Sequence, residues 1–282
     1  MFTAAALRMI LIFFAMLFPA AHAAFGAGSH TISVRISNGQ SAYTQKVPVT
    51  EGSQGNFMGP VKAINAVPKQ LIFNGLLTRG SGAPGALNLQ YQLELSGGPG
   101  SQGRSIQAQG ELAIRPGDEL AAIKCGPWTV TLGLDVKSAA KKKPRDAAWN
   151  PAGLPNYRLT ADMRAGGAKE QCGFISKAGA QSNMVDSIVQ GGRKYGFILN
   201  GLFAPAGDGR SFSLQYQAEL GSPSVRPVQT QNEVALTLNR KRKFSGRNYS
   251  LQFLLEGKMP SKRTDGGKKG GPQEKYGTVQ PL

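Results

Sequence analysis

The sequence predicts an all-β protein made of two tandem antiparallel β-sandwich or barrel-like domains with the same topology. Short segments alternate between apolar and polar residues with period two, and glycine-rich turns separate them, as is typical of half-buried strands. The same segments return in the same order later in the chain: LNLQYQLEL at 87–95 is followed by FSLQYQAEL at 212–220. Self-similarity on this scale indicates a duplicated domain rather than a solenoid of short repeats.

The chain begins with a segment typical of a secretory signal peptide, which we place at residues 1–23. Arg8 supplies a positive charge, Met9 to Pro19 form an apolar run, and small residues end the segment at Ala23. The apolar run is shorter than the roughly 20 residues that a membrane-spanning helix needs. The sequence therefore predicts export to a bacterial periplasm, with secretion or association with the outer membrane as the alternatives.

The first predicted domain covers residues 24–137. Its clearest alternating segments are 87–95, 106–114 and 128–134, and we expect these three strands to pair in sequence order as a meander. The polar sides of the first two strands carry Gln90, Gln92 and Glu94 and Gln107, Gln109 and Glu111. We expect the register that sets Glu94 opposite Gln107, Gln92 opposite Gln109 and Gln90 opposite Glu111, because like charges placed opposite one another repel.

The second predicted domain covers residues 156–257 and repeats this polar face. Its equivalent pairs are Glu219 with Gln229, Gln217 with Gln231 and Gln215 with Glu233. A glutamine side chain both donates and accepts hydrogen bonds. The doubled polar face is therefore the predicted interaction surface, and a merely solvated outer face is the alternative.

Basic residues are concentrated in a linker at 138–155, in a tail at 258–282 that we expect to be disordered, and in a run before the last strand. The chain has a net charge of +17. We place the run in a turn between the last two strands of the second domain, where the first domain has Asp118 and Glu119. The predicted anion-binding residues are Lys141, Lys142, Lys143 and Arg145 of the linker and Arg240, Lys241, Arg242, Lys243 and Arg247 of the run.

The two cysteines, Cys125 and Cys172, occupy non-equivalent positions in the two copies, one on each side of the linker. In an oxidising compartment we expect them to form one disulfide that joins the domains. Two buried free thiols are the alternative.

Few residues suit catalysis. Without the signal peptide the chain keeps one histidine, His30, and a zinc site needs three or four His, Cys or acidic ligands. We predict no metal site, no cofactor, no small-molecule substrate and no enzymatic activity. A hydrolase that uses the neighbouring glutamates Glu94 and Glu111 is the remaining catalytic alternative.

These features predict a non-catalytic, exported structural or adaptor protein of the bacterial cell envelope, which docks on partner proteins through its sheet faces or edges. The alternative is a protein that binds a polyanion or an anionic membrane surface through the linker, the 240–247 turn and the tail. Nucleic acid is a less favoured partner.

Overall fold

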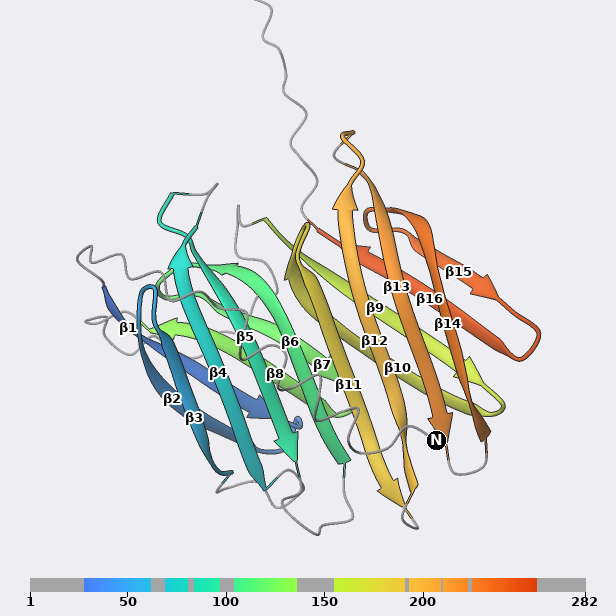
Figure 1. Cartoon of the computed structure of the whole chain (residues 1–282), viewed down its shortest axis with the longest axis horizontal. Helices are drawn as coiled ribbons and strands as arrows, with labels where there is room; N and C mark the ends of the chain where they lie inside the picture. The colour runs from blue at the N-terminus through green and yellow to red at the C-terminus, as the bar shows by residue number, and fades with distance from the viewer. Residues whose placement is uncertain are drawn as a thin grey trace, which may run out of the picture.

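The computed structural model describes residues 28–61, 69–80, 84–96, 104–135, 155–190, 193–208, 210–222 and 225–257. The predicted signal peptide and tail lie outside these residues, as do the linker cations Lys141, Lys142, Lys143 and Arg145. The described residues form sixteen strands and no helix, arranged in two eight-stranded antiparallel sheets (Figure 1).

Each sheet takes strands from both halves of the chain. In spatial order, sheet A contains β15 (Lys241–Ser245), β16 (Tyr249–Glu256), β9 (Asn156–Ala165), β10 (Ala168–Lys177), β7 (Glu119–Cys125), β8 (Trp128–Asp135), β1 (Ser29–Ser37) and β2 (Ala42–Thr50). Sheet B contains β14 (Val225–Thr237), β13 (Ser211–Ser222), β12 (Arg193–Pro205), β11 (Gln181–Gln190), β6 (Arg104–Ile114), β5 (Leu87–Ser96), β4 (Gln70–Arg79) and β3 (Gln54–Pro60).

The two halves have the same topology, which confirms the predicted fold class. The first half contributes β7-β8-β1-β2 and β6-β5-β4-β3, and the second contributes β15-β16-β9-β10 and β14-β13-β12-β11 in the corresponding order. The halves meet edge to edge, because β10 pairs with β7 in sheet A and β11 pairs with β6 in sheet B. Among the described residues, both sheets therefore run without interruption from one half into the other, as Figure 1 shows.

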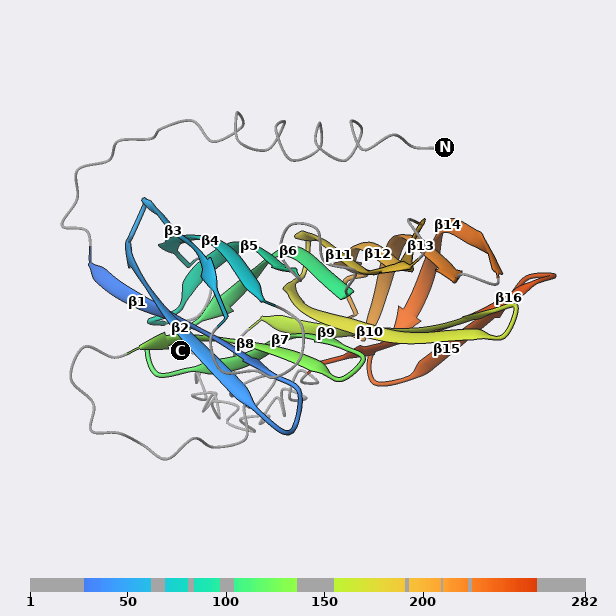
Figure 2. The same cartoon turned by 90° about the horizontal axis from the view of Figure 1, so that it is seen from below.

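The sheets pack face to face, with sheet B above sheet A in the view of Figure 2. Along most strands, alternate apolar residues point between the sheets and are buried, as the period-two pattern requires. Apart from Ala86 and Ala113, the buried hydrophobic residues of both halves form one continuous cluster that includes Ile36, Phe73, Phe174 and Phe253. The duplicated halves thus share one core as well as two sheets.

The predicted meander is wrong. β5 and β6 pair as expected, but the third segment, β8, lies in sheet A between β7 and β1. The chain crosses between the sheets before β7, a strand that we did not predict. A β-bulge between Ala121 and Ile123 breaks the alternation of apolar and polar residues in β7, so the sequence carries no period-two signal there.

The position of the basic run is also corrected. Lys241, Arg242 and Lys243 do not form a turn but the first three residues of β15, which pairs with β16. β15 is the outermost strand of sheet A, and its first three residues are exposed, so the strand lacks the apolar alternation of a half-buried strand. Arg240 precedes the strand and Arg247 follows it.

Asp208 closes the turn between β12 and β13 and provides a test of this hairpin. Its carboxylate accepts hydrogen bonds from the Ser211 amide at 2.6 Å, the Ser211 hydroxyl at 2.7 Å and the Arg210 amide at 2.9 Å. These bonds, those of Ser211 first, lower the pKa of Asp208 to about 2.

A depressed carboxyl pKa stabilises the fold above the unfolded pKa of about 3.9, and the stabilisation is lost as the pH falls through the folded pKa. We therefore expect Asp208→Ala to lower the melting temperature above pH 4 and to differ progressively less from the unchanged protein towards pH 2. Thermal unfolding of both proteins as a function of pH measures this difference. A difference that stays constant between pH 5 and pH 2 would contradict it.

Candidate functional site

The outer face of sheet B carries the predicted polar residues in the predicted register. Glu94 lies opposite Gln107, Gln92 opposite Gln109 and Gln90 opposite Glu111. The second half repeats the arrangement with Glu219 opposite Gln229, Gln217 opposite Gln231 and Gln215 opposite Glu233. In each half the two glutamates therefore lie opposite glutamines and not opposite each other.

The middle pairs belong to a longer row that crosses the entire sheet. Residues directly opposite one another in neighbouring strands point to the same face. From β3 to β14, each of the eight strands of sheet B contributes an asparagine or a glutamine to one file of opposing residues, which we name the amide row: Asn56, Asn74, Gln92, Gln109, Asn183, Asn200, Gln217 and Gln231. The row continues across the junction between the halves, where Gln109 of β6 lies opposite Asn183 of β11.

The amide row is partly linked by hydrogen bonds that repeat in the two halves. Asn74 Nδ2 donates to Gln92 Oε1 at 3.3 Å, and the equivalent Asn200 Nδ2 donates to Gln217 Oε1 at 3.1 Å. Asn183 Oδ1, at the junction, is buried and has no hydrogen-bond partner among the described residues. Each amide has two donor hydrogens and two acceptor sites, so these bonds orient the side chains while leaving capacity for a partner.

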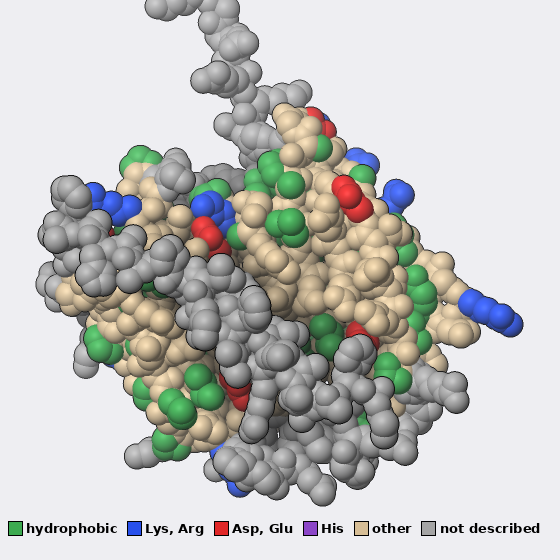
Figure 3. Space-filling view, in the orientation of Figure 1, with side chains coloured by type: hydrophobic (Ala, Val, Ile, Leu, Met, Phe, Trp, Pro, Cys, Tyr) green, Lys and Arg blue, Asp and Glu red, His purple; other side chains and the backbone are tan. Residues whose placement is uncertain are grey.

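The rows on either side of the amide row mix aliphatic residues, glutamates and glutamines, again with the same order in each half. On β4 the asparagine lies between Leu76 and Ile72, and on β12 it lies between Leu202 and Ile198. Met58 of β3 is 67% exposed on this face. Figure 3 shows the visible part of this face mostly in the colour of uncharged polar side chains and backbone, with isolated hydrophobic and acidic side chains.

Two glutamates of this face, Glu111 and Glu233, are held by neighbouring side chains. Glu111 accepts hydrogen bonds from Gln90 at 3.3 Å and from Lys177 Nζ at 3.1 Å. Its equivalent, Glu233, accepts bonds from Gln215 and from the Ser213 hydroxyl. The geometry therefore pairs each of these carboxylates with donors, and neither faces a second carboxylate as the hydrolase alternative requires.

Half of the amide row was not among the predicted site residues. Asn56, Asn74, Asn183 and Asn200 lie on β3, β4, β11 and β12, whose alternation is weaker than that of β5 and β13. A signal was present, because Asn74-Gly75 and Asn200-Gly201 match in the two copies. Pairing these segments with β5 and β13 would have placed both asparagines opposite the glutamines.

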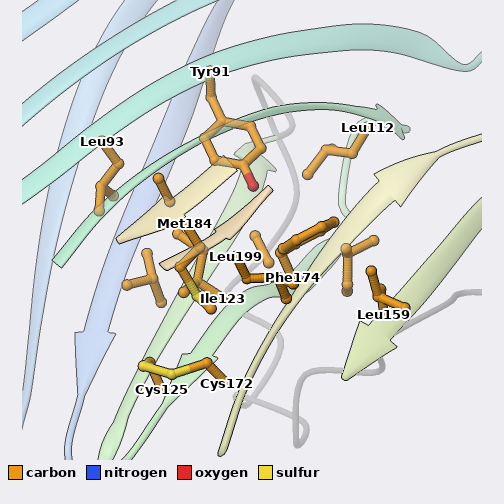
Figure 4. Packing of buried hydrophobic residues seen from close by; sticks show 14 of the residues in the cluster. Tyr91, Leu93, Leu112, Ile123, Cys125, Leu159, Cys172, Phe174, Met184 and Leu199 are labelled. Carbon is orange, nitrogen blue, oxygen red and sulfur yellow. A yellow bond between two sulfur atoms is a disulfide. The ribbon is translucent and has the colours of Figure 1, made fainter. Parts of the chain in front are cut away.

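The junction between the halves holds the predicted disulfide. Cys125 of β7 lies directly opposite Cys172 of β10, and the two are joined, with a Cα–Cα distance of 4.3 Å. Both cysteines are fully buried among the core residues labelled in Figure 4. Asp186 Oδ2 lies 3.1 Å from Cys125 Sγ, and Glu170 lies close by. These four residues could be taken for a metal site, but bonded cysteines offer no thiolate ligands.

Elsewhere in the described residues, the predicted cations of β15 lie far from His30, the histidine to which no site role was assigned. Lys241, Arg242 and Lys243 lie on the exposed edge of sheet A, far along the sheet from β1, where His30 contacts Glu51 at 2.9 Å. Lys and Arg side chains project at the right of Figure 3, on the side where Figure 1 places β15. The structure thus presents two surfaces, the amide row on a face and a cationic strand on an edge.

Comparison with known proteins assigns neither surface. A scan against protein-family models and searches of the curated proteins and the solved structures find no match to this chain. Within the described parts of the chain, no helix has the length and apolar character required to cross a membrane.

Proposed function

We propose that this is a non-catalytic, exported structural or adaptor protein of the bacterial cell envelope, which docks on partner proteins through the outer face of sheet B. The observation that carries the proposal is the amide row. Contact with solvent alone does not require the same kind of side chain in eight successive strands and across the junction of the two halves. Amides aligned in this way present donors and acceptors to a partner without the desolvation cost of charges.

The size of the face supports a protein partner. Strands lie about 4.8 Å apart and alternate residues about 6.8 Å apart, so eight strands and three rows span roughly 38 by 20 Å, on the order of 750 Å². Each partner in a standard protein interface contributes roughly 800 Å². The aliphatic residues beside the amide row, among them Ile72 and Ile198, add apolar area to this surface. The disulfide between β7 and β10 supports export, because disulfides persist in oxidising compartments.

A second candidate function is the binding of a polyanion or an anionic membrane surface. The observation that favours it is the run of three exposed cations in β15, none of which forms an ion pair with a described residue. Adjacent like charges repel, and an anionic partner would relieve that repulsion. Such binding should weaken steeply as the salt concentration rises, whereas docking through amides and aliphatic groups should not.

The test of the proposed function is the capture of partners from the cell envelope with the processed protein as bait. We expect the paired substitutions Gln92→Arg and Gln217→Arg, which place bulky charges in the amide row of both halves, to reduce the recovery of captured proteins at least tenfold. The matched control is Thr31→Arg with Thr129→Arg, two half-buried positions on strands of sheet A that are remote from β15. Undiminished recovery with the amide-row variant, or equal loss with the control, would refute docking through this face.

A further inference from the structure

The junction between the halves shows what the edge of this fold accepts. β7 is bound on one side by β8 of its own half and on the other by β10 of the second half. The β10 contact places Cys172 opposite Cys125, Gly173 opposite Lys124 and Phe174 opposite Ile123. A strand from outside the first half therefore completes its sheet by backbone pairing, which is the geometry of strand addition.

β15 is the same edge in the second half. The two strands pair equivalently with their neighbours: Ile123 lies opposite Val130 as Phe244 lies opposite Leu251, and Lys124 opposite Thr129 as Ser245 opposite Ser250. The side of β15 away from β16 has no paired strand within the described residues. Among the described residues, the backbone edge of β15 is therefore unpaired where the backbone edge of β7 is occupied.

The side chains of the two edges differ in charge. The positions filled in β7 by Glu119, Leu120 and Ala121 are filled in β15 by Lys241, Arg242 and Lys243, as their partners on β8 and β16 show. Arg242 lies 5.7 Å from the centroid of the Phe244 ring, so a cation–π contact holds it against the core. Lys241 and Lys243 lie opposite Leu254 and Gln252, which alternate with the buried residues of β16 and so point outward.

A second copy of this chain does not fit this edge. The strands equivalent to β10 and β11 are β2 and β3, and β2 carries Lys46 and Pro48 but no acidic residue. In sheet B, the facing residues Ser187 and Ser105 at the junction correspond to Pro60 of β3 and Pro227 of β14 at the free edges. Proline has no amide hydrogen for a ladder, so addition of a further copy would meet proline on both sides. β15 itself contains no proline.

We propose that the free edge of β15 accepts an extended acidic segment of a partner protein as a ninth strand of sheet A. Backbone pairing along β15 supplies the main contact, as β10 does on β7. Carboxylates on the outward side of the added strand pair with Lys241 and Lys243. This inference rests on the proposed function, because it names a second contact for the same class of partner at a surface separate from the amide row.

The test uses the processed full-length protein and a synthetic eight-residue peptide in which glutamate alternates with valine. We expect the peptide to bind, to slow amide hydrogen exchange in residues 241–245, and to bind at least tenfold more weakly to the variant with Lys241→Gln, Arg242→Gln and Lys243→Gln. The control variant, Lys69→Gln with Arg79→Gln and Arg210→Gln, removes the same charge at other exposed positions and should bind normally.

A second peptide in which every backbone amide is N-methylated keeps the charge but has no amide hydrogen for a ladder, and we expect it not to bind. Equal affinity of the protein for both peptides would overturn the proposal in favour of polyanion binding. Heparin that competes for the site as effectively as the first peptide would do the same. Concentration-dependent self-association that the triple β15 variant abolishes would overturn it in favour of a second copy. These variants leave the amide row intact. A result that overturns the β15 proposal is therefore distinguishable from a result that refutes docking through the amide row.

Discussion

Replacing both cysteines with alanine, Cys125→Ala and Cys172→Ala, is expected to lower the free energy of unfolding by about 4 kcal/mol. The disulfide joins residues separated by 47 positions in sequence. In the chain-entropy model, cutting such a link releases roughly this amount of conformational entropy in the unfolded chain. The loss is large beside the 5–15 kcal/mol that typically stabilises a folded protein, so the junction should be sensitive to redox conditions.

Urea unfolding of the double variant, of the unchanged protein and of the reduced unchanged protein measures this loss. Because the link constrains the unfolded chain, its removal should expose more surface on unfolding and increase the dependence of the unfolding free energy on urea. The reduced protein should match the double variant. A loss below 1 kcal/mol in both would show that the link contributes little to the stability of the joined halves.

The duplication and the strand register could be predicted from the sequence because both depend on local patterns. Charge avoidance excluded the register of β5 and β6 that sets Glu94 opposite Glu111, and the register expected on that basis is the one observed. The same rule held in β13 and β14. The register depends on two neighbouring segments and the duplication on matching the sequence with itself, so neither inference needs to know which strands meet in space.

Beyond its disulfide, the edge-to-edge pairing at the junction could not be predicted, because β6 and β14 have similar sequences but different surroundings. β6 carries Ala108 and Gly110 where β14 carries Thr230 and Asn232. Gly110 allows β11 to approach, since a Cβ there would lie 2.8 Å from Ser182 Oγ. Asn232 is exposed at the free edge. These differences distinguish β6, which lies inside the sheet, from β14, which lies at its edge. They can be interpreted in this way only when the neighbouring strand is known.

The amide row was found only in part because its uniformity is a property of the sheet and not of any strand. Gln92 and Gln109 belong to strongly alternating segments and were identified. Asn56 and Asn183 lie in β3 and β11, where the sequence places asparagine among glycine, methionine and serine and resembles a turn. Tertiary pairing with β4 and β12 overrides that local preference.

The substitution Phe174→Ala is expected to destabilise the protein by roughly 3–5 kcal/mol, the range for removing a buried aromatic side chain. Phe174 of β10 is 1% exposed and lies opposite Ile123 of β7, so it packs on both sides of the junction. Its ring reaches across the core to Gly201 of β12, where an added Cβ would lie 3.3 Å from Phe174 Cζ. Alanine would therefore leave a cavity bordered by both halves and both sheets (Figure 4).

The same experiment decides whether the halves unfold together. Since sheets and core are continuous, we expect Phe174→Ala to unfold in one transition, at a lower urea midpoint but with an unchanged dependence on urea. The matched control is Phe73→Ala, a fully buried residue in β4 of the first half, which should give a single transition of similar loss. Two resolved transitions in either variant would mean that the halves fold as separate units and that the shared sheets contribute little cooperativity. A single transition in both variants would show that the joined pair of halves, and not the single half, is the cooperative unit of unfolding.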